Sequence, residues 1–167
     1  MSIRFNADEV FEIAEQIERN GARWYRMVAD NAATADSKDM LLSLAAMEDQ
    51  HLARFSDMRR ELTAAERKPV TFDPEGDAVL YLQAMADGSV FDMRADPTAT
   101  LTGKETLEEV LRTAISMENE SILFYLGMKE SVPADLGGAR LEGIIKEEMG
   151  HVVTLSRRLA AVRFPSR

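Results

Sequence analysis

The sequence predicts an all-α domain, a four-helix bundle with one long crossover between the second helix and the third. Four long stretches carry apolar residues three and four positions apart. Short loops separate the first stretch from the second and the third from the fourth, whereas about 35 residues separate the middle pair, which makes the middle two helices parallel. We expect a single domain over 1–167, with hairpins at about 6–66 and 104–163 and the crossover at about 67–103.

The first hairpin is predicted from its apolar spacing and its loop. One helix is expected over about 6–31 and the next over about 38–66, which Pro69 ends because proline cannot continue a helix. Between them, the stretch NAATADSKD is rich in turn and capping residues, so Asp36 or Ser37 is expected to cap the second helix.

The second hairpin follows the same pattern. Its first helix is expected over about 106–130, opened by a capping box in which Thr106 and Glu109 cap each other's backbone N–H groups. Its second helix is expected to begin near 133–135, because proline fits the first turn of a helix, and to end near 163.

The crossover is predicted to contain a short extra helix. The stretch DAVLYLQAMAD has helical spacing and is followed by Gly88, a residue typical of helix ends. Its apolar side chains, together with Phe91, are too numerous for a disordered linker. We therefore expect an ordered crossover, although it is also acidic.

Composition excludes several classes of function. The net charge is −9 and the chain has no run of Lys and Arg, so nucleic acids and anionic membranes are not expected partners. The absence of cysteine excludes disulfides, thiolate zinc sites and cysteine-held iron–sulfur centres. The N-terminal MSIRFNADEV lacks the apolar run of a signal peptide, and no stretch of about 18 apolar residues occurs. We expect a cytoplasmic protein.

A polar face recurs in the two hairpins, 100 residues apart. The recurring pairs are Glu18 and Glu118, Glu48 and Glu148, and His51 and His151. These two histidines are the only ones in the chain. Each polar residue interrupts an apolar stripe, as Glu18 does between Ala14 and Ala22, so all six are expected to point into the bundle core.

Four carboxylates in one core require compensating positive charge. A buried carboxylate is unfavourable unless it is paired or binds a metal, and several together repel one another. Two divalent ions would balance four carboxylates and leave both imidazoles neutral as ligands, a donor set that suits iron, manganese and zinc. The alternatives are a buried charged network without metal and, for either Glu-x-x-His alone, an ordinary salt-bridged helix surface.

The repeated pattern resembles the ferritin-like di-iron carboxylate family, and within it the rubrerythrin-like branch of the erythrin type, which lacks a rubredoxin domain. That family places one Glu on each of two helices and a Glu-x-x-His on each of the other two. The resemblance implies a homodimer and two iron ions, with manganese or zinc as substitutes. The implied terminal ligands are Glu18 and His51 for one ion and Glu118 and His151 for the other, and the implied bridging ligands are Glu48 and Glu148.

Three further side chains are candidates for contacts to these ligands. Tyr25 and Tyr125 are expected to donate a hydrogen bond to a ligating carboxylate or to relay electrons, with a purely structural core tyrosine as the alternative. Glu147 either orients a histidine or is plain surface charge. Met47 holds the matching place in the first hairpin, so the surroundings of the two histidines are predicted to differ.

Two departures from rubrerythrins bear on function. Rubrerythrins proper carry a cysteine-ligated iron domain, so electrons would reach this cysteine-free chain from an external donor. They also carry an extra glutamate one turn after the third-helix ligand, where this chain has Ser121. The predicted function is a di-iron oxidoreductase that reacts with peroxide or dioxygen or oxidises Fe(II). The alternatives are metal binding or iron handling without redox turnover, and an interaction module that uses the acidic crossover and an apolar patch near Tyr81 and Phe91.

Overall fold

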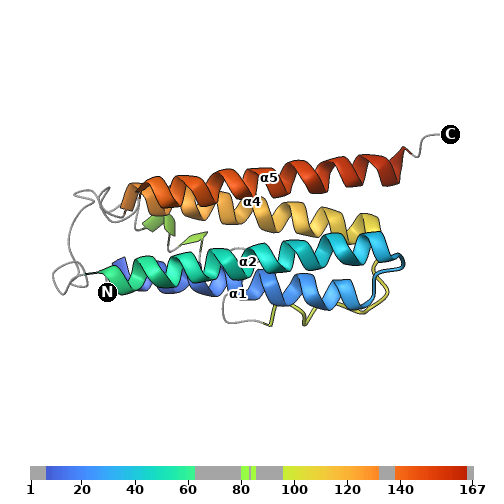
Figure 1. Cartoon of the computed structure of the whole chain (residues 1–167), viewed down its shortest axis with the longest axis horizontal. Coiled ribbons are helices and arrows are strands. Elements are labelled where there is room, and N and C mark those ends of the chain that lie inside the picture. The colour runs from blue at the N-terminus through green and yellow to red at the C-terminus, as the bar shows by residue number, and fades with distance from the viewer. Residues whose placement is uncertain (1–6, 63–79, 83, 86–95, 132–137, 165–167) are drawn as a thin grey trace.

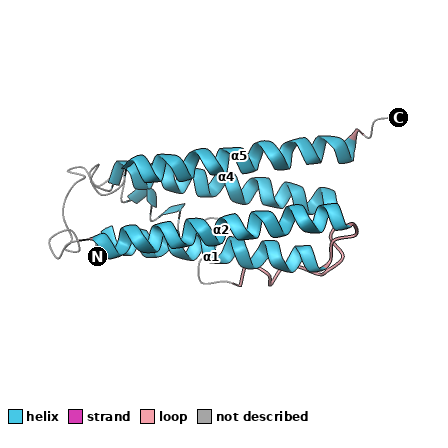
Figure 2. Ribbon diagram, in the orientation of Figure 1, coloured by secondary structure: helices cyan, strands magenta, loops and turns pink. Residues whose placement is uncertain are grey.

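Four long helices form the bundle in the computed structural model of the chain (Figure 1). The structure describes residues 7–62, 80–82, 84–85, 96–131 and 138–164. The long helices are α1 (Ala7–Asp30), α2 (Ala35–Glu61), α4 (Leu107–Ser131) and α5 (Gly138–Arg163). Within these ranges the chain is helix, turn or loop, and no strand occurs among them (Figure 2).

The helices pair as two antiparallel hairpins. α1 packs along α2, α4 packs along α5, and α1 also contacts α4. α2 and α4 run in the same direction (Figure 1). The predicted all-α bundle with one long crossover is therefore confirmed.

The helix starts follow local capping chemistry. Thr34 caps α2, because its Oγ1 accepts a hydrogen bond from the Ser37 backbone N–H at 3.2 Å. The prediction that Asp36 or Ser37 would be the cap is wrong, since the helix begins earlier and already includes both residues. The capping box of α4 is confirmed: the Thr106 backbone N–H donates to Glu109 Oε2 at 2.8 Å, and the Glu109 N–H donates back to Thr106 Oγ1 at 3.3 Å.

The crossover contributes one turn of described helix, at 80–82 and 84–85, so the predicted extra helix is present in part. Leu82 in this turn is fully buried and belongs to the same apolar cluster as Tyr125 and Met128 of α4. The expected end at Gly88 lies outside the described residues, as do the expected helix boundaries near 66 and 133–135.

The core consists of two apolar clusters, one toward each end of the bundle. On α2, Leu41 and Leu44 belong to one cluster, and Phe55 and Met58 belong to the other. The other long helices divide in the same way, and on every one of them the predicted polar residues fall between the two apolar groups. The polar face is thus a layer at mid-height, closed off from water by apolar packing above and below it.

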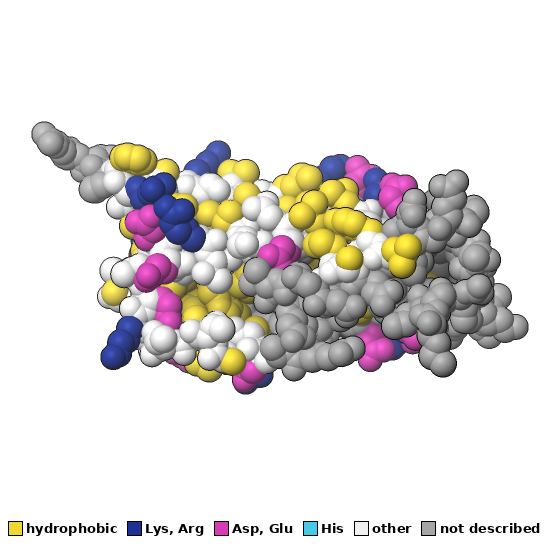
Figure 3. Space-filling model, turned by 180° about the vertical axis from the view of Figure 1, so that it is seen from behind, with side chains coloured by type: hydrophobic (Ala, Val, Ile, Leu, Met, Phe, Trp, Pro, Cys, Tyr) yellow, Lys and Arg dark blue, Asp and Glu magenta, His cyan; other side chains and the backbone are white. Residues whose placement is uncertain are grey.

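Some apolar side chains remain exposed on the side of the bundle that α4 shares with the crossover turn. They are Leu80, Tyr81, Leu123 and Leu126. Figure 3 shows apolar side chains gathered over part of this face. Phe91, which the interaction-module hypothesis also invoked, lies outside the described residues. None of the helices in the described part of the chain combines the length and the apolar character that crossing a bilayer requires.

The crossover turn approaches α4 at a glycine. A Cβ on Gly127 would lie 2.7 Å from Tyr81 Cε1 and 3.1 Å from Leu82 Cδ2, closer than side chains normally pack. The Tyr81 hydroxyl also donates a hydrogen bond to the Leu123 backbone carbonyl at 3.3 Å. Gly127 therefore gives the crossover turn the space that it needs against α4.

A matched pair of glycine substitutions tests this contact. Gly150→Ala on α5, where a Cβ would meet no atom within 4 Å, should raise the free energy of unfolding by about 0.5–1 kcal/mol through helix propensity alone. Gly127→Ala should be less stable than Gly150→Ala by about 1–3 kcal/mol because it overpacks the crossover turn. Chemical denaturation measures both, and equal stabilisation by the two substitutions would contradict the close approach.

Candidate metal centre

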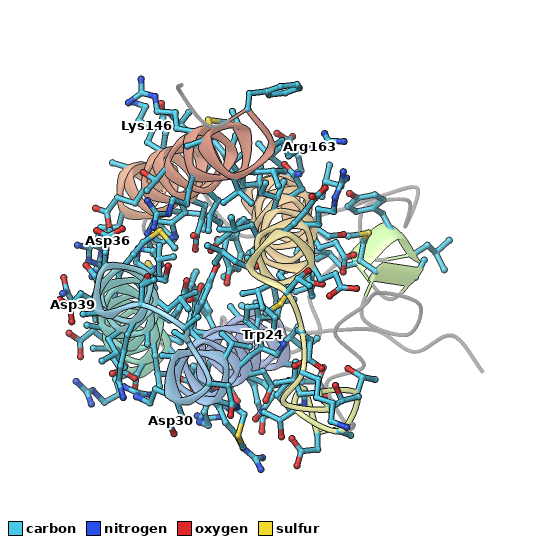
Figure 4. All side chains as sticks on the ribbon, turned by 90° about the vertical axis from the view of Figure 1, so that its right-hand side faces the viewer. Trp24, Asp30, Asp36, Asp39, Lys146 and Arg163 are labelled. Atoms are coloured by element: carbon cyan, nitrogen blue, oxygen red, sulfur yellow. The ribbon has the colours of Figure 1, made fainter. Side chains whose placement is uncertain are left out.

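The six predicted side chains meet at the centre of the bundle. All are buried, with at most 4% of any residue exposed; they are Glu18, Glu48, His51, Glu118, Glu148 and His151. Figure 4 looks along the bundle and shows side chains filling the space enclosed by the four helices, with oxygen atoms among them. α1 and α4 supply one glutamate each, whereas α2 and α5 supply a glutamate and a histidine one turn apart.

Glu148 and Glu48 each face both histidines. Glu148 Oε1 lies 3.0 Å from His51 Nδ1, and its Oε2 lies 2.9 Å from His151 Nδ1. Glu48 repeats the arrangement at 3.6 Å on each side, with Oε2 toward His51 and Oε1 toward His151. Each of these carboxylates therefore spans the space between the two imidazoles, as a bridging ligand would.

Glu18 and Glu118 each face one histidine only. Glu18 Oε2 lies 3.5 Å from His51 Nδ1, and Glu118 Oε2 lies 3.4 Å from His151 Nδ1. Two groups of four donors result, each with its ligand atoms within 4.8 Å of one another: Glu18, Glu48, His51 and Glu148 in one, and Glu48, Glu118, Glu148 and His151 in the other. The groups share the two spanning glutamates, so the geometry describes two adjacent positions.

Both tyrosines reach across the bundle to the other hairpin. The Tyr25 hydroxyl on α1 donates to Glu118 Oε1 on α4, and the Tyr125 hydroxyl on α4 donates to Glu18 Oε1 on α1. Burial first, and then the neighbouring carboxylates, raise the pKa of both phenols well above the usual value. The phenols therefore stay protonated, and each fixes one oxygen of a glutamate while the other oxygen faces a histidine.

The outer nitrogens of the two histidines have different neighbours. His51 Nε2 lies 2.9 Å from Glu147 Oε2, and Arg54 Nη1 donates to the other oxygen of Glu147 at 2.8 Å. His151 Nε2 lies 3.4 Å from the sulfur of Met47. Glu147 thus contacts the histidine of the opposite hairpin, not the one on its own helix.

The four buried carboxylates differ in the direction of their pKa shifts. Burial is the largest effect on Glu18, Glu48 and Glu118: it raises the pKa of the first two above the usual value and that of Glu118 to about 8. Burial acts on Glu148 in the same direction, but the close approach of His151 and His51 to its two oxygens outweighs burial and lowers the Glu148 pKa to about 2.

For the histidines, burial and the neighbouring carboxylates have opposite effects on the pKa. Burial lowers the pKa of His151, but the contact with Glu118 and the close approach of Glu148 outweigh burial and raise it to about 10. Contacts with the carboxylates likewise raise the pKa of His51. Partial burial acts to raise the pKa of Glu147, but Arg54 and His51 together hold it below the usual value, so it stays ionised. The raised pKa values of both histidines and of three carboxylates favour protonation of the cluster when no metal is bound.

The donor set fits two divalent cations. Several inward-facing atoms are buried without a hydrogen-bond partner in the described part of the chain: Glu18 Oε2, both carboxylate oxygens of Glu148, and His51 Nδ1. Buried polar atoms are rarely left unpaired in proteins, and these four converge on the same space. Carboxylate oxygens and imidazole nitrogens are ligands of iron, manganese and zinc, and two such ions would balance four carboxylates.

Sequence reasoning did not single out Arg54 or Gly21. Arg54 lies one turn after His51, at helical spacing that brings it beside Glu147. A Cβ on Gly21 would lie 3.5 Å from Glu48 Cγ, so α1 and α2 pass close together at the level of the cluster. Ser121, which stands where rubrerythrins carry an additional glutamate, donates its hydroxyl to the Met117 carbonyl at 3.2 Å.

Comparison with known proteins supports the fold. No family model matches the sequence, and no curated protein matches it significantly. A solved structure from Thermotoga maritima, described as a candidate ferritin-like diiron-carboxylate protein, matches with a TM-score of 0.69 and 21% sequence identity. The match covers 95% of this chain and 97% of that protein. The chain therefore has the ferritin-like fold, and within it a buried carboxylate and histidine cluster.

The metal-free protein should lose stability as the pH rises from about 5 to about 9. Glu118 keeps its proton to about pH 8 when folded but releases it near 4.5 when unfolded, so its contribution is present below 4.5 and lost as the pH rises through 8. His151, raised from 6.5 to about 10, acts in the same direction at higher pH. The loss is on the order of a few kcal/mol.

Denaturant unfolding of the chelator-treated protein across this pH range measures the effect. Glu118→Gln keeps a neutral group of similar shape beside Tyr25 and removes one titrating carboxyl. Its stability should fall less than that of the parent between about pH 5 and pH 8. An equal fall in both proteins would show that Glu118 does not hold a proton in the folded state.

Proposed function

We propose that this protein binds two iron ions in the buried cluster and is a rubrerythrin-like di-iron oxidoreductase. Its substrate would be peroxide or dioxygen, or Fe(II) that it oxidises. The observation that carries the proposal is that Glu48 and Glu148 each direct one oxygen toward His51 and the other oxygen toward His151. A carboxylate with one oxygen toward each of two ligating imidazoles is placed to bridge two metal ions.

The ligand roles follow from the contacts. Glu48 and Glu148 would bridge the ions, and the remaining pairs would be terminal: Glu18 with His51, and Glu118 with His151. When bound, two iron ions supply two electrons between them, which is the number needed to reduce peroxide to water.

The surrounding residues keep the ligands in place and keep water out. Tyr25 and Tyr125 hold their protons and each orients one terminal glutamate. The Phe55 ring lies 5.0 Å from the Tyr125 ring, and the Trp24 ring lies 5.3 Å from that of Tyr25, so each phenol is packed against a second aromatic side chain. Such packing holds the ligands close to the geometry that a metal requires.

Electrons would come from a separate donor protein or small reductant, because the chain has no cysteine with which to hold a second iron centre. The homodimer implied by the resemblance stays a prediction, which sedimentation equilibrium of the purified protein tests.

Metal analysis tests the ligand set. Protein purified under iron-replete conditions should contain about two ions per chain, located by anomalous scattering between the two histidines. Replacing both Glu48 and Glu148 by Ala should reduce the content below one ion per chain, since each position loses two ligands. Glu142→Ala, which removes a surface carboxylate paired with Lys146, should leave it unchanged. Unchanged metal content in the double variant would refute the site.

Stopped-flow oxidation tests the activity. The di-ferrous protein should be oxidised by peroxide or dioxygen faster than Fe(II) in buffer, and turnover with excess Fe(II) would identify a ferroxidase. Oxidation no faster than in buffer, or a tight di-zinc form that iron cannot displace, would favour metal binding or iron handling without redox turnover.

A further inference from the structure

The two halves of the cluster differ in what lies behind each histidine. Behind His51, Glu147 Oε2 lies 2.9 Å from Nε2. Behind His151, the corresponding neighbour is the Met47 sulfur at 3.4 Å. Residues 47 and 147 hold matching places in the two hairpins, and both side chains are partly buried. The inner nitrogens, in contrast, see equivalent sets of carboxylates.

Glu147 is held in position by a third residue. Arg54 Nη1 donates to Glu147 Oε1 at 2.8 Å, which leaves Oε2 for His51. The place in α5 that matches Arg54 is occupied by Thr154, so the His151 side lacks both the carboxylate and the guanidinium that would fix it. His51, Glu147 and Arg54 therefore form a three-residue unit that has no counterpart at the matching positions around His151.

This unit has a direct consequence for a ligating imidazole. A carboxylate that accepts the Nε2–H sets the tautomer, so that the Nδ1 lone pair faces the cluster. The carboxylate also increases the basicity of Nδ1, which makes the imidazole a stronger ligand for a metal ion. A thioether is a weak, neutral acceptor and gives little of either effect. Loss of such an outer partner typically reduces metal affinity by about 10–100-fold.

We propose that the two metal positions are inequivalent, and that the position that includes His51 binds its ion first and more tightly than the position that includes His151. Glu147 is the positioning residue responsible, with Arg54 holding it. The inference rests on the metal site of the proposed function, but it does not depend on redox turnover. It concerns the order of binding, with a difference in affinity of about 10–100-fold.

Titration of the metal-free protein with Co²⁺ under anaerobic conditions tests the inference. Binding should occur in two steps. Crystals prepared with one equivalent of Co²⁺ should show anomalous scattering mainly at the His51 position. Glu147→Met gives both histidines the same neighbour and should merge the two steps by weakening the first about 10–100-fold. Glu142→Met, with the same change of charge on the surface of α5, should leave both steps in place.

The reciprocal exchange is the sharper test. Combining Met47→Glu with Glu147→Met moves the carboxylate behind His151, so the first equivalent of Co²⁺ should now occupy the His151 position. Circular dichroism establishes whether the helices of the double variant are intact. If the double variant does not fold, the Co²⁺ titration of Glu147→Met tests the inference by itself.

The outcomes separate the two proposals. Three results would each overturn the inference and leave the metal site standing. They are equal Co²⁺ affinities of the two positions in the parent protein, an unchanged difference between these affinities in Glu147→Met, and an unchanged order of filling in the folded double variant. Absence of Co²⁺ from the cluster would overturn the metal site of the proposed function and the inference with it. A parent protein that binds in order but fails to react with oxidants would refute only the redox activity.

Discussion

The structure depends on the burial of four carboxylates at the centre of a small helical bundle. A single unpaired carboxylate in such a place costs several kcal/mol, and neighbouring negative charges increase the cost. The surrounding architecture compensates for this in three ways. Two apolar clusters close the layer from above and below, two phenols donate to Glu18 and Glu118, and two histidines lie close to all four carboxylates.

Several polar contacts of the cluster join the two hairpins, whereas most of the close helix packing lies within each hairpin. Tyr25 and Tyr125 each donate to a glutamate on the opposite hairpin, and His51 contacts Glu147 across the same boundary. If one hairpin slid by one helical turn, these partners would separate by about 5 Å and leave buried polar groups unpaired. The polar layer therefore fixes how the hairpins align, which apolar surfaces alone specify poorly.

Much of the candidate site could be predicted from the sequence because helical spacing determines which residues share a face. Glu48 and His51 are one turn apart, and their repetition in the second hairpin places all four residues toward the same axis. The partner of each tyrosine could not be predicted in this way, because spacing along one helix says nothing about which residue of a facing helix lies at the same height. The α2 cap was missed for a local reason: Thr34, Asp36 and Ser37 can all cap a helix, and tertiary packing selects among them.

The two-fold resemblance of the hairpins has a consequence for how the site can change. If the bundle consisted of two separate copies of one hairpin related by exact two-fold symmetry, the two histidines would necessarily have identical surroundings. A continuous chain that carries two hairpins is free of that restriction, and each half can be altered alone. The contrast between the Glu147 carboxylate and the Met47 thioether is a difference of this kind. Covalent linkage of the halves thus allows an asymmetric centre inside a nearly symmetric fold.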